Sequence, residues 1–135
     1  MRLIALTLAL FVAASVPAQE YKPYPRARIT PEQWQQYFEE VSSKHASSRR
    51  EFPAEYLVVF ENTLEYTTYA FTQPGHAAHP AWITRHVIQD NVGVNVRQIG
   101  YFAGEEAPFA KLFREYQELN AKMREDFQRK SREQK

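Results

Sequence analysis

The sequence contains no cysteine and only four glycines. Without cysteine there can be no disulfide, no cysteine nucleophile and no lipid-modified cysteine anchor. The glycines are scattered, at positions 75, 93, 100 and 104, so no glycine-rich loop of the phosphate-binding kind is present. The serines after residue 18 lie in polar stretches, without the glycine-flanked turn that exposes a nucleophile. These absences argue against nucleotide binding and against a serine or cysteine hydrolase.

Residues 1–18 have the features of a secretory signal peptide. Arg2 gives a positive start, residues 3–14 are apolar except for Thr7, and residues 16–18 are small enough for a cleavage site. The apolar run is shorter than the roughly 20 residues of a membrane-spanning helix. No Asn-x-Ser/Thr acceptor is present, which favours a bacterial compartment. The sequence therefore predicts a cleaved signal, no membrane anchor after cleavage, and a soluble periplasmic or secreted protein.

The predicted mature chain is electrically balanced. Cleavage removes Arg2, one of 17 basic residues, and leaves 16 against 16 acidic residues. A balanced charge gives no electrostatic support for nucleic acid or an anionic membrane as a partner. We predict an extended arm rich in proline and tyrosine over residues 19–29, a single domain over 30–128 and a polar tail over 129–135. The arm is either a linker or a segment lying along the domain.

A helix is predicted from residue 31 to about 44. Thr30 is a capping residue, Pro31 suits the first helical position, and Gln33 stands where a capping box places it. Trp34, Tyr37, Phe38 and Val41 then recur at helical spacing on one face. The following residues, 42–51, are polar and are predicted to be a helix end or a loop.

Residues 56–61 and 64–72 are rich in side chains that favour strands. A single helix is the alternative, because Pro53 and Glu55 could begin it and part of the segment fits a helical stripe. Residues 82–89 and 92–102 are predicted to form a hairpin around Asp90 and Asn91. Val94 and Val96 fall on one face of the second strand and residues 99 and 101 on the other. That pattern predicts either a bulge near Arg97 or a strand buried on both faces.

A second helix is predicted after Gly104, because acidic residues and Pro108 precede a long apolar stripe. The stripe comprises Phe109, Leu112, Phe113, Tyr116, Leu119, Met123 and Phe127. The predicted fold class is α+β: an N-terminal helix, an antiparallel sheet of about four strands, and a long C-terminal amphipathic helix packed on the sheet. This plan resembles cystatin-like domains. Residues 71–82, with Gly100-Tyr101-Phe102-Ala103-Gly104, resemble small uncharacterised exported proteins of Gram-negative bacteria, a resemblance that implies no activity.

Three histidines are candidate metal ligands. His76 and His79 stand three residues apart in a loop bounded by Gly75 and Pro80, and His86 follows on the next predicted strand. Neutral imidazole is a good ligand for Zn or Cu. The simpler interpretation is that these side chains only cap backbone groups of the loop, since Pro80 prevents them from sharing a helix face. We favour this simpler interpretation.

Aromatic side chains on the predicted strands either line a ligand groove or belong to the core, and the core is the commoner outcome. We predict as ligand-binding residues Tyr69, Phe71, His76, His79, Trp82, His86 and Tyr101. No catalytic set and no cofactor are predicted. The favoured function is an exported, non-catalytic binding or interaction module of the bacterial periplasm with a protein or peptide partner in the cell envelope. The alternative is a metal-binding protein or metal-dependent enzyme using the three histidines.

Overall fold

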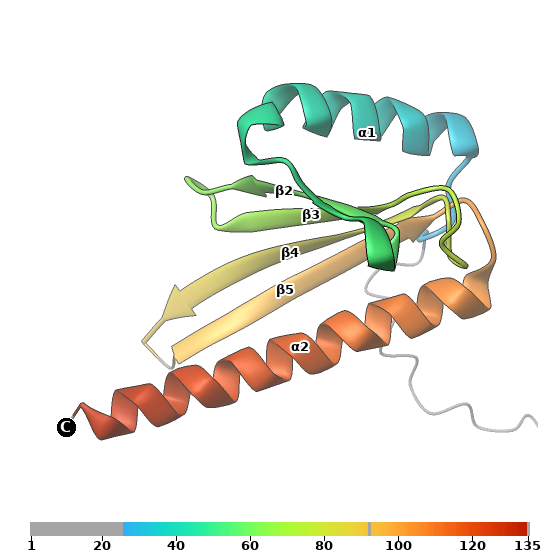
Figure 1. The fold of residues 1–135 in the computed structure, drawn as a ribbon. Coiled ribbons are helices and arrows are strands. Elements are labelled where there is room, and N and C mark those ends of the chain that lie inside the picture. Colours follow the sequence, from blue (N-terminus) through green and yellow to red (C-terminus); the bar gives the residue numbers. More distant parts are fainter. Residues whose placement is uncertain (1–25, 92, 135) are drawn as a thin grey trace, which may run out of the picture.

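The computed structural model describes residues 26–91 and 93–134, so the predicted signal peptide and most of the predicted arm lie outside the described residues. A five-stranded antiparallel sheet has one helix on each face (Figure 1). The elements in chain order are α1 (Pro31–Lys44), η1 (Ala46–Ser48), β1 (Arg50–Phe52), η2 (Pro53–Glu55), β2 (Leu57–Asn62), β3 (Thr67–Thr72), β4 (Ala81–Asp90), β5 (Gly93–Phe102) and α2 (Glu106–Glu133). The α+β class is confirmed.

Helix α1 begins and ends where the sequence predicts. The Thr30 hydroxyl accepts a hydrogen bond from the Gln33 backbone N–H (3.1 Å), and the Gln33 side chain accepts one from the Thr30 N–H (2.9 Å). The inner side of the helix packs on the sheet, and Trp34 Nε1 donates to the Ala81 carbonyl (2.9 Å). The buried cluster on this face consists of Trp34, Val41, Val58, Phe60, Phe71 and Trp82.

Residues 57–72 form two paired strands, which excludes the alternative of one helix. The sheet has five strands rather than about four, because β1 pairs with β2 from Arg50↔Val59 to Phe52↔Leu57. This segment includes residues 50 and 51, which were predicted to be part of a helix end or a loop. All three residues of β1 are exposed, so the strand has no apolar alternation that a sequence could reveal.

The β4–β5 hairpin pairs without interruption from Ala81↔Phe102 to Asp90↔Gly93, so the bulge predicted near Arg97 is wrong. The other predicted possibility explains the apolar pattern. Phe102 belongs to the cluster beneath α2, whereas Tyr101 packs on the cluster beneath α1. Helices on both faces therefore account for apolar side chains on both faces of β5.

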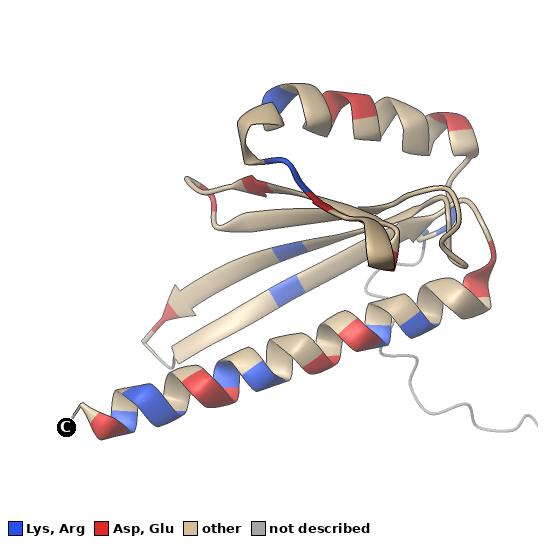
Figure 2. Ribbon diagram, viewed as in Figure 1, with Lys and Arg blue, Asp and Glu red and all other residues tan. Residues whose placement is uncertain are grey.

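Helix α2 packs on β4 and β5 through a second buried cluster, which contains Ala27, Ala78, Ala81, Ile83, Phe102, Phe109, Leu112 and Phe113. The contact is close at Gly100, where an added Cβ would lie 2.8 Å from the Phe109 ring. The residues predicted to be a polar tail are helical as far as Glu133. Figure 2 shows charged residues along the whole of α2 and few on the strands.

The described end of the predicted arm lies against the domain. The Ile29 N–H donates to the Phe102 carbonyl (2.9 Å), and the Phe102 N–H donates to the Ala27 carbonyl (3.0 Å). Residues 27–29 thus lie beside the last residue of β5. Among residues 26–91 and 93–134, no helix has the length and apolar content needed to cross a membrane.

Candidate binding groove

The face of the sheet that carries α2 is only partly covered by that helix. Helix α2 lies over β4 and β5, whereas Leu57, Val59 and Ala70 of β2 and β3 lie beside it. Leu57 and Ala70 are buried and form a floor, and Tyr116 and Leu119 of α2 form a wall. A groove therefore runs along one side of α2.

The groove consists of three adjoining hollows of about 420, 210 and 550 Å³. Leu57 and Tyr116 line the first and the second, Arg85 lines the second and the third, and Leu119 lines the first and the third. These shared residues make the hollows one continuous surface, which we call the Arg85 groove. Its apolar lining includes Leu57, Val59, Leu112, Tyr116, Leu119 and Met123.

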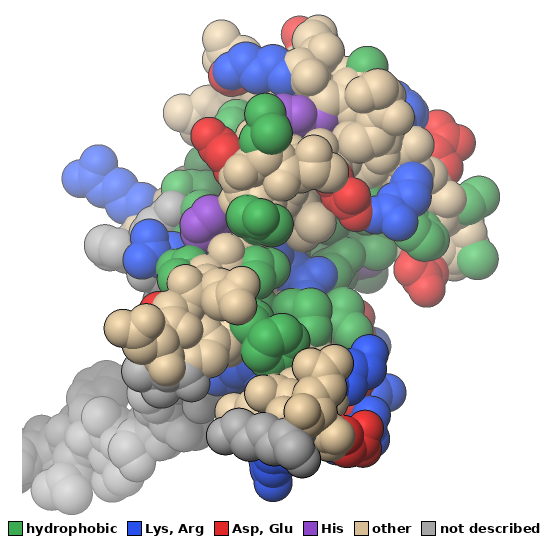
Figure 3. Space-filling view, turned by 90° about the vertical axis from the view of Figure 1, so that its left-hand side faces the viewer, with side chains coloured by type: hydrophobic (Ala, Val, Ile, Leu, Met, Phe, Trp, Pro, Cys, Tyr) green, Lys and Arg blue, Asp and Glu red, His purple; other side chains and the backbone are tan. Residues whose placement is uncertain are grey.

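Apolar side chains of the groove are open to solvent. Leu119 is 48% exposed and Phe127 is 43% exposed, although both belong to the apolar stripe of α2. Figure 3 shows hydrophobic side chains gathered between the carboxyl-terminal part of α2 and the strands of the sheet. Exposed apolar side chains rimmed by polar residues are a feature of interaction sites.

Arg85 occupies the middle of the groove. Its Nε donates a hydrogen bond to Asn120 Oδ1 (2.7 Å), and its guanidinium carbon lies 5.3 Å from the centre of the Tyr116 ring. Burial lowers the pKa of the Arg85 guanidinium and raises the pKa of the Tyr116 hydroxyl, since both groups are partly withdrawn from water. The arginine nevertheless remains charged at physiological pH.

No carboxylate in the described part of the chain forms an ion pair with Arg85. Three acidic side chains line the hollows that Arg85 also lines. Glu61 pairs with Arg50, Asp126 pairs with Arg129 (3.2 Å), and Glu55 forms no ion pair with Arg85. None of the ion pairs formed by the described residues includes Arg85. The groove therefore combines an apolar lining with a half-buried, uncompensated positive charge.

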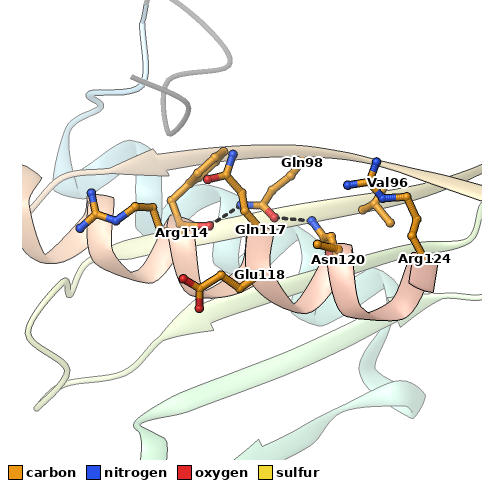
Figure 4. A pocket seen from close by; sticks show the side chains of 9 residues that line it. Val96, Gln98, Arg114, Gln117, Glu118, Asn120 and Arg124 are labelled. Carbon is orange, nitrogen blue, oxygen red and sulfur yellow. Dashed lines mark hydrogen bonds between the residues drawn. The ribbon is translucent and has the colours of Figure 1, made fainter. Parts of the chain in front are cut away.

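A chain of amide hydrogen bonds beneath α2 holds Arg85 in place. Asn120, which is only 4% exposed, donates from Nδ2 to Gln98 Oε1 (2.7 Å), and Gln98 Nε2 donates to the Phe113 carbonyl (2.8 Å). Figure 4 shows Gln98 and Asn120 pointing toward each other between β5 and α2. The hollow on that side of the helix, about 530 Å³, has both polar and apolar side chains in its lining and includes Arg114 and Arg124.

The three histidines predicted as metal ligands have separate partners. His76 Nδ1 accepts from the Ala78 N–H (2.9 Å), His79 Nδ1 is 2.8 Å from Thr72 Oγ1, and His86 Nδ1 is 3.0 Å from Thr67 Oγ1. Within the described part of the chain, no group of three or more His, Asp or Glu side chains is arranged to hold a metal. The metal hypothesis stays a prediction, which elemental analysis of untagged protein tests.

The aromatic residues predicted to bind a ligand lie on the α1 face of the sheet. Phe71 and Trp82 are 0% and 5% exposed and belong to the core, while Tyr69 and Tyr101 pack against that cluster. Of the predicted site residues, His76 alone lines the Arg85 groove. The groove thus lies on the opposite face of the sheet from most of the predicted site.

Apart from His76, the side chains that line the Arg85 groove were not among the predicted site residues. One signal was present in β4, where Arg85 interrupts an apolar face formed by Ile83 and Val87 at a period of two. A charged side chain at such a position needs a specific environment. A second signal was the stripe of α2, which continues to Phe127, beyond the residues that the core buries.

Comparison with protein-family models, curated proteins and solved structures found no match to this chain. The functional assignment therefore rests on the geometry and charge of the Arg85 groove. Its open shape and apolar lining suit the uptake of a partner segment, and the uncompensated guanidinium suits an anionic group on that segment.

Proposed function

We propose that the mature protein is an exported, soluble, non-catalytic binding module of the bacterial periplasm, and that it takes up a protein or peptide partner in the Arg85 groove. One observation carries the proposal: the half-buried Arg85 guanidinium has no ion-pair partner among residues 26–91 and 93–134, and it lies in a groove with exposed apolar side chains.

This arrangement does not favour the stability of the free protein. A partly buried charge loses hydration without gaining a counter-charge. Exposed leucine and phenylalanine side chains keep apolar surface in contact with water, which is unfavourable. A bound partner removes both costs, because it covers Leu119 and Phe127 and offers polar groups to Arg85. Burial of about 1,000 Å² or more in total is expected of a specific contact.

Selection from a random peptide library on the mature protein tests the binding role. We expect the enriched peptides to contain apolar residues. Leu119→Asp should abolish their binding, because a bound peptide would have to remove water from the new carboxylate. Leu64→Asp is the matched control, because Leu64 is 91% exposed in the turn between β2 and β3, outside the groove. Peptides that bind both variants as they bind the wild type would contradict the assignment of the groove.

Export is tested separately, by expressing the full chain in a Gram-negative bacterium and fractionating the cells. We expect a periplasmic product whose first residue, found by mass spectrometry, is Gln19. A full-length product that begins at Met1 and stays in the cytoplasm would contradict the proposed location and leave the groove unaffected.

A further inference from the structure

We infer that the segment bound in the Arg85 groove is an apolar peptide with an acidic side chain near its middle, and that this carboxylate pairs with Arg85. The inference rests on the proposed function, because it specifies the partner of the same groove. It follows from where Arg85 lies, which of its donors are free, and how the other charges of the groove are distributed.

Apolar surface lies on both sides of Arg85. Leu57 and Leu112 line the groove toward one end, and Met123 and Phe127 line it toward the other. From Leu112 to Phe127, helix α2 extends about 22 Å, at about 1.5 Å per residue. An extended peptide of about seven residues spans that length. Arg85 lies near the midpoint, so a ligand that fills both halves must carry its anionic group within its length.

The same position argues against a fatty acid. Its carboxylate stands at one end of the molecule, so pairing with Arg85 would leave half of the apolar groove empty. A peptide carries side chains on both sides of an acidic residue and can cover Leu112 and Phe127 at once. The length of the groove therefore favours a peptide.

Arg85 has the free donors that a carboxylate needs. Its only hydrogen bond with the described residues is the one from Nε to Asn120, so no described acceptor takes up its two terminal nitrogens, and the side chain lines the groove. A guanidinium can offer two parallel N–H donors to the two oxygens of a carboxylate. Asn120 fixes the plane of the guanidinium, which lowers the entropy lost on binding.

The other charges set where the acidic side chain can lie. Glu55 and Glu115 line the end of the groove near His76, and Glu55 also lines the middle, beside Arg85 and the Glu61 that pairs with Arg50. Lys122 and Lys130 line the opposite end, where the one carboxylate, Asp126, pairs with Arg129. Carboxylates repel an acidic side chain from the first end, whereas the lysines and Arg85 attract it. The favourable positions are therefore at Arg85 and beyond it toward the lysines.

The test uses two synthetic peptides that are blocked at both ends. Both have leucines on either side of a central residue, which is glutamate in one peptide and glutamine in the other. We expect the glutamate peptide to bind the mature wild-type protein at least about ten-fold more tightly, as measured by fluorescence anisotropy, since hydrogen bonds to charged groups are the stronger ones. Arg85→Gln should abolish this preference. Arg85→Lys should reduce it, because the ammonium lacks the planar fork.

Arg97→Gln is the matched control, since it removes the same charge from the neighbouring strand β5 at an exposed position outside the groove. It should leave the preference for glutamate unchanged. Circular dichroism of each variant verifies that it folds. If Arg85→Gln does not fold, the comparison of Arg85→Lys with the wild type still tests the role of Arg85.

Three outcomes would overturn the inference. Equal binding of the two peptides, still abolished by Leu119→Asp, would refute the role of Arg85 while leaving the binding function intact. Failure of both peptides to bind the wild type would refute the partner chemistry, and the library selection would then decide the binding function by itself. Arg85-dependent binding of dodecanoate, with no peptide binding, would assign the groove to a lipid.

Discussion

Arg85 on β4 donates a hydrogen bond of 2.7 Å from Nε to Oδ1 of Asn120 on α2. Asn120 in turn donates to Gln98 on β5. One buried amide thus connects the helix to both long strands. It also explains why α2 holds its position over the sheet beyond Phe113, where the buried apolar cluster ends.

Replacement of Asn120 should test this connection. Asn120→Ala leaves the Arg85 Nε–H and the Gln98 carbonyl oxygen without their partner, so we expect the free energy of unfolding to fall by about 1–3 kcal/mol. Urea unfolding followed by circular dichroism measures the change. Gln128→Ala, an exposed amide on the same helix, should stay within about 0.5 kcal/mol. Equal effects of the two substitutions would contradict a structural role for Asn120.

Two buried threonines should respond in opposite ways to replacement by valine. The Thr84 hydroxyl is buried without a partner among the described residues, so Thr84→Val should be neutral or stabilise the fold by up to about 1 kcal/mol. The Thr72 hydroxyl accepts from the Ala81 N–H (2.9 Å) and lies 2.8 Å from His79 Nδ1. Thr72→Val should therefore cost about 1–3 kcal/mol. Thermal unfolding compares the two variants. If Thr84→Val lost as much stability as Thr72→Val, the Thr84 hydroxyl would have a hydrogen-bond partner, contrary to this prediction.

Stability should decrease in mild acid because of two histidines. Burial lowers the pKa of His76 and of His79 below the ordinary value of 6.5, since a charged ring loses hydration there. The unfolded chain then binds more protons than the folded chain. The contribution of the two neutral histidines to the free energy of unfolding is therefore complete above pH 6.5 and is lost as the pH falls through their folded-state pKa values.

Urea unfolding at several pH values from 8 to 5 measures this effect. In the double variant His76→Gln/His79→Gln, the free energy of unfolding should decrease less over that range than in the wild type, each protein being compared with itself at pH 8. Parallel curves for the two proteins would mean that other groups cause the decrease.

The contact between Gly100 and Phe109 should make Gly100→Ala destabilising. The added Cβ would lie 2.8 Å from the Phe109 ring and 2.9 Å from Ile83 Cδ1, so we expect a loss of about 1–3 kcal/mol. Phe109→Leu removes the part of the ring that meets the methyl group. The double variant should therefore lose less stability than the two single losses together. If the losses in the free energy of unfolding measured in urea were simply additive, the added methyl group would not press on the Phe109 ring.

Local features of the sequence were sufficient to predict the helices. Thr30 and Gln33 form a capping box within four residues of chain, so no distant contact was needed to predict the start of α1. In β5, Val94 and Tyr101 point to opposite faces. From this pattern the sequence predicted either a bulge or a strand covered on both sides, and the second alternative is correct.

The groove could not be predicted in the same way. It exists because α2 lies over β4 and β5 and leaves Leu57 and Val59 of β2 beside it, and no local pattern fixes the lateral position of a helix on a sheet. Strand β1 was missed for a related reason, since its pairing with β2 supplies the order that its exposed side chains do not.

The order of the strands has a consequence for how the chain reaches its fold. In the sheet, each strand pairs with its neighbour in the sequence, from β1 through β5. Contacts of low sequence separation lose little loop-closure entropy, and proteins rich in them fold fast for their size. Because the chain also has no cysteine, no oxidation step has to accompany that process. Its refolding after dilution from denaturant should therefore proceed at the same rate in reducing and oxidising buffers.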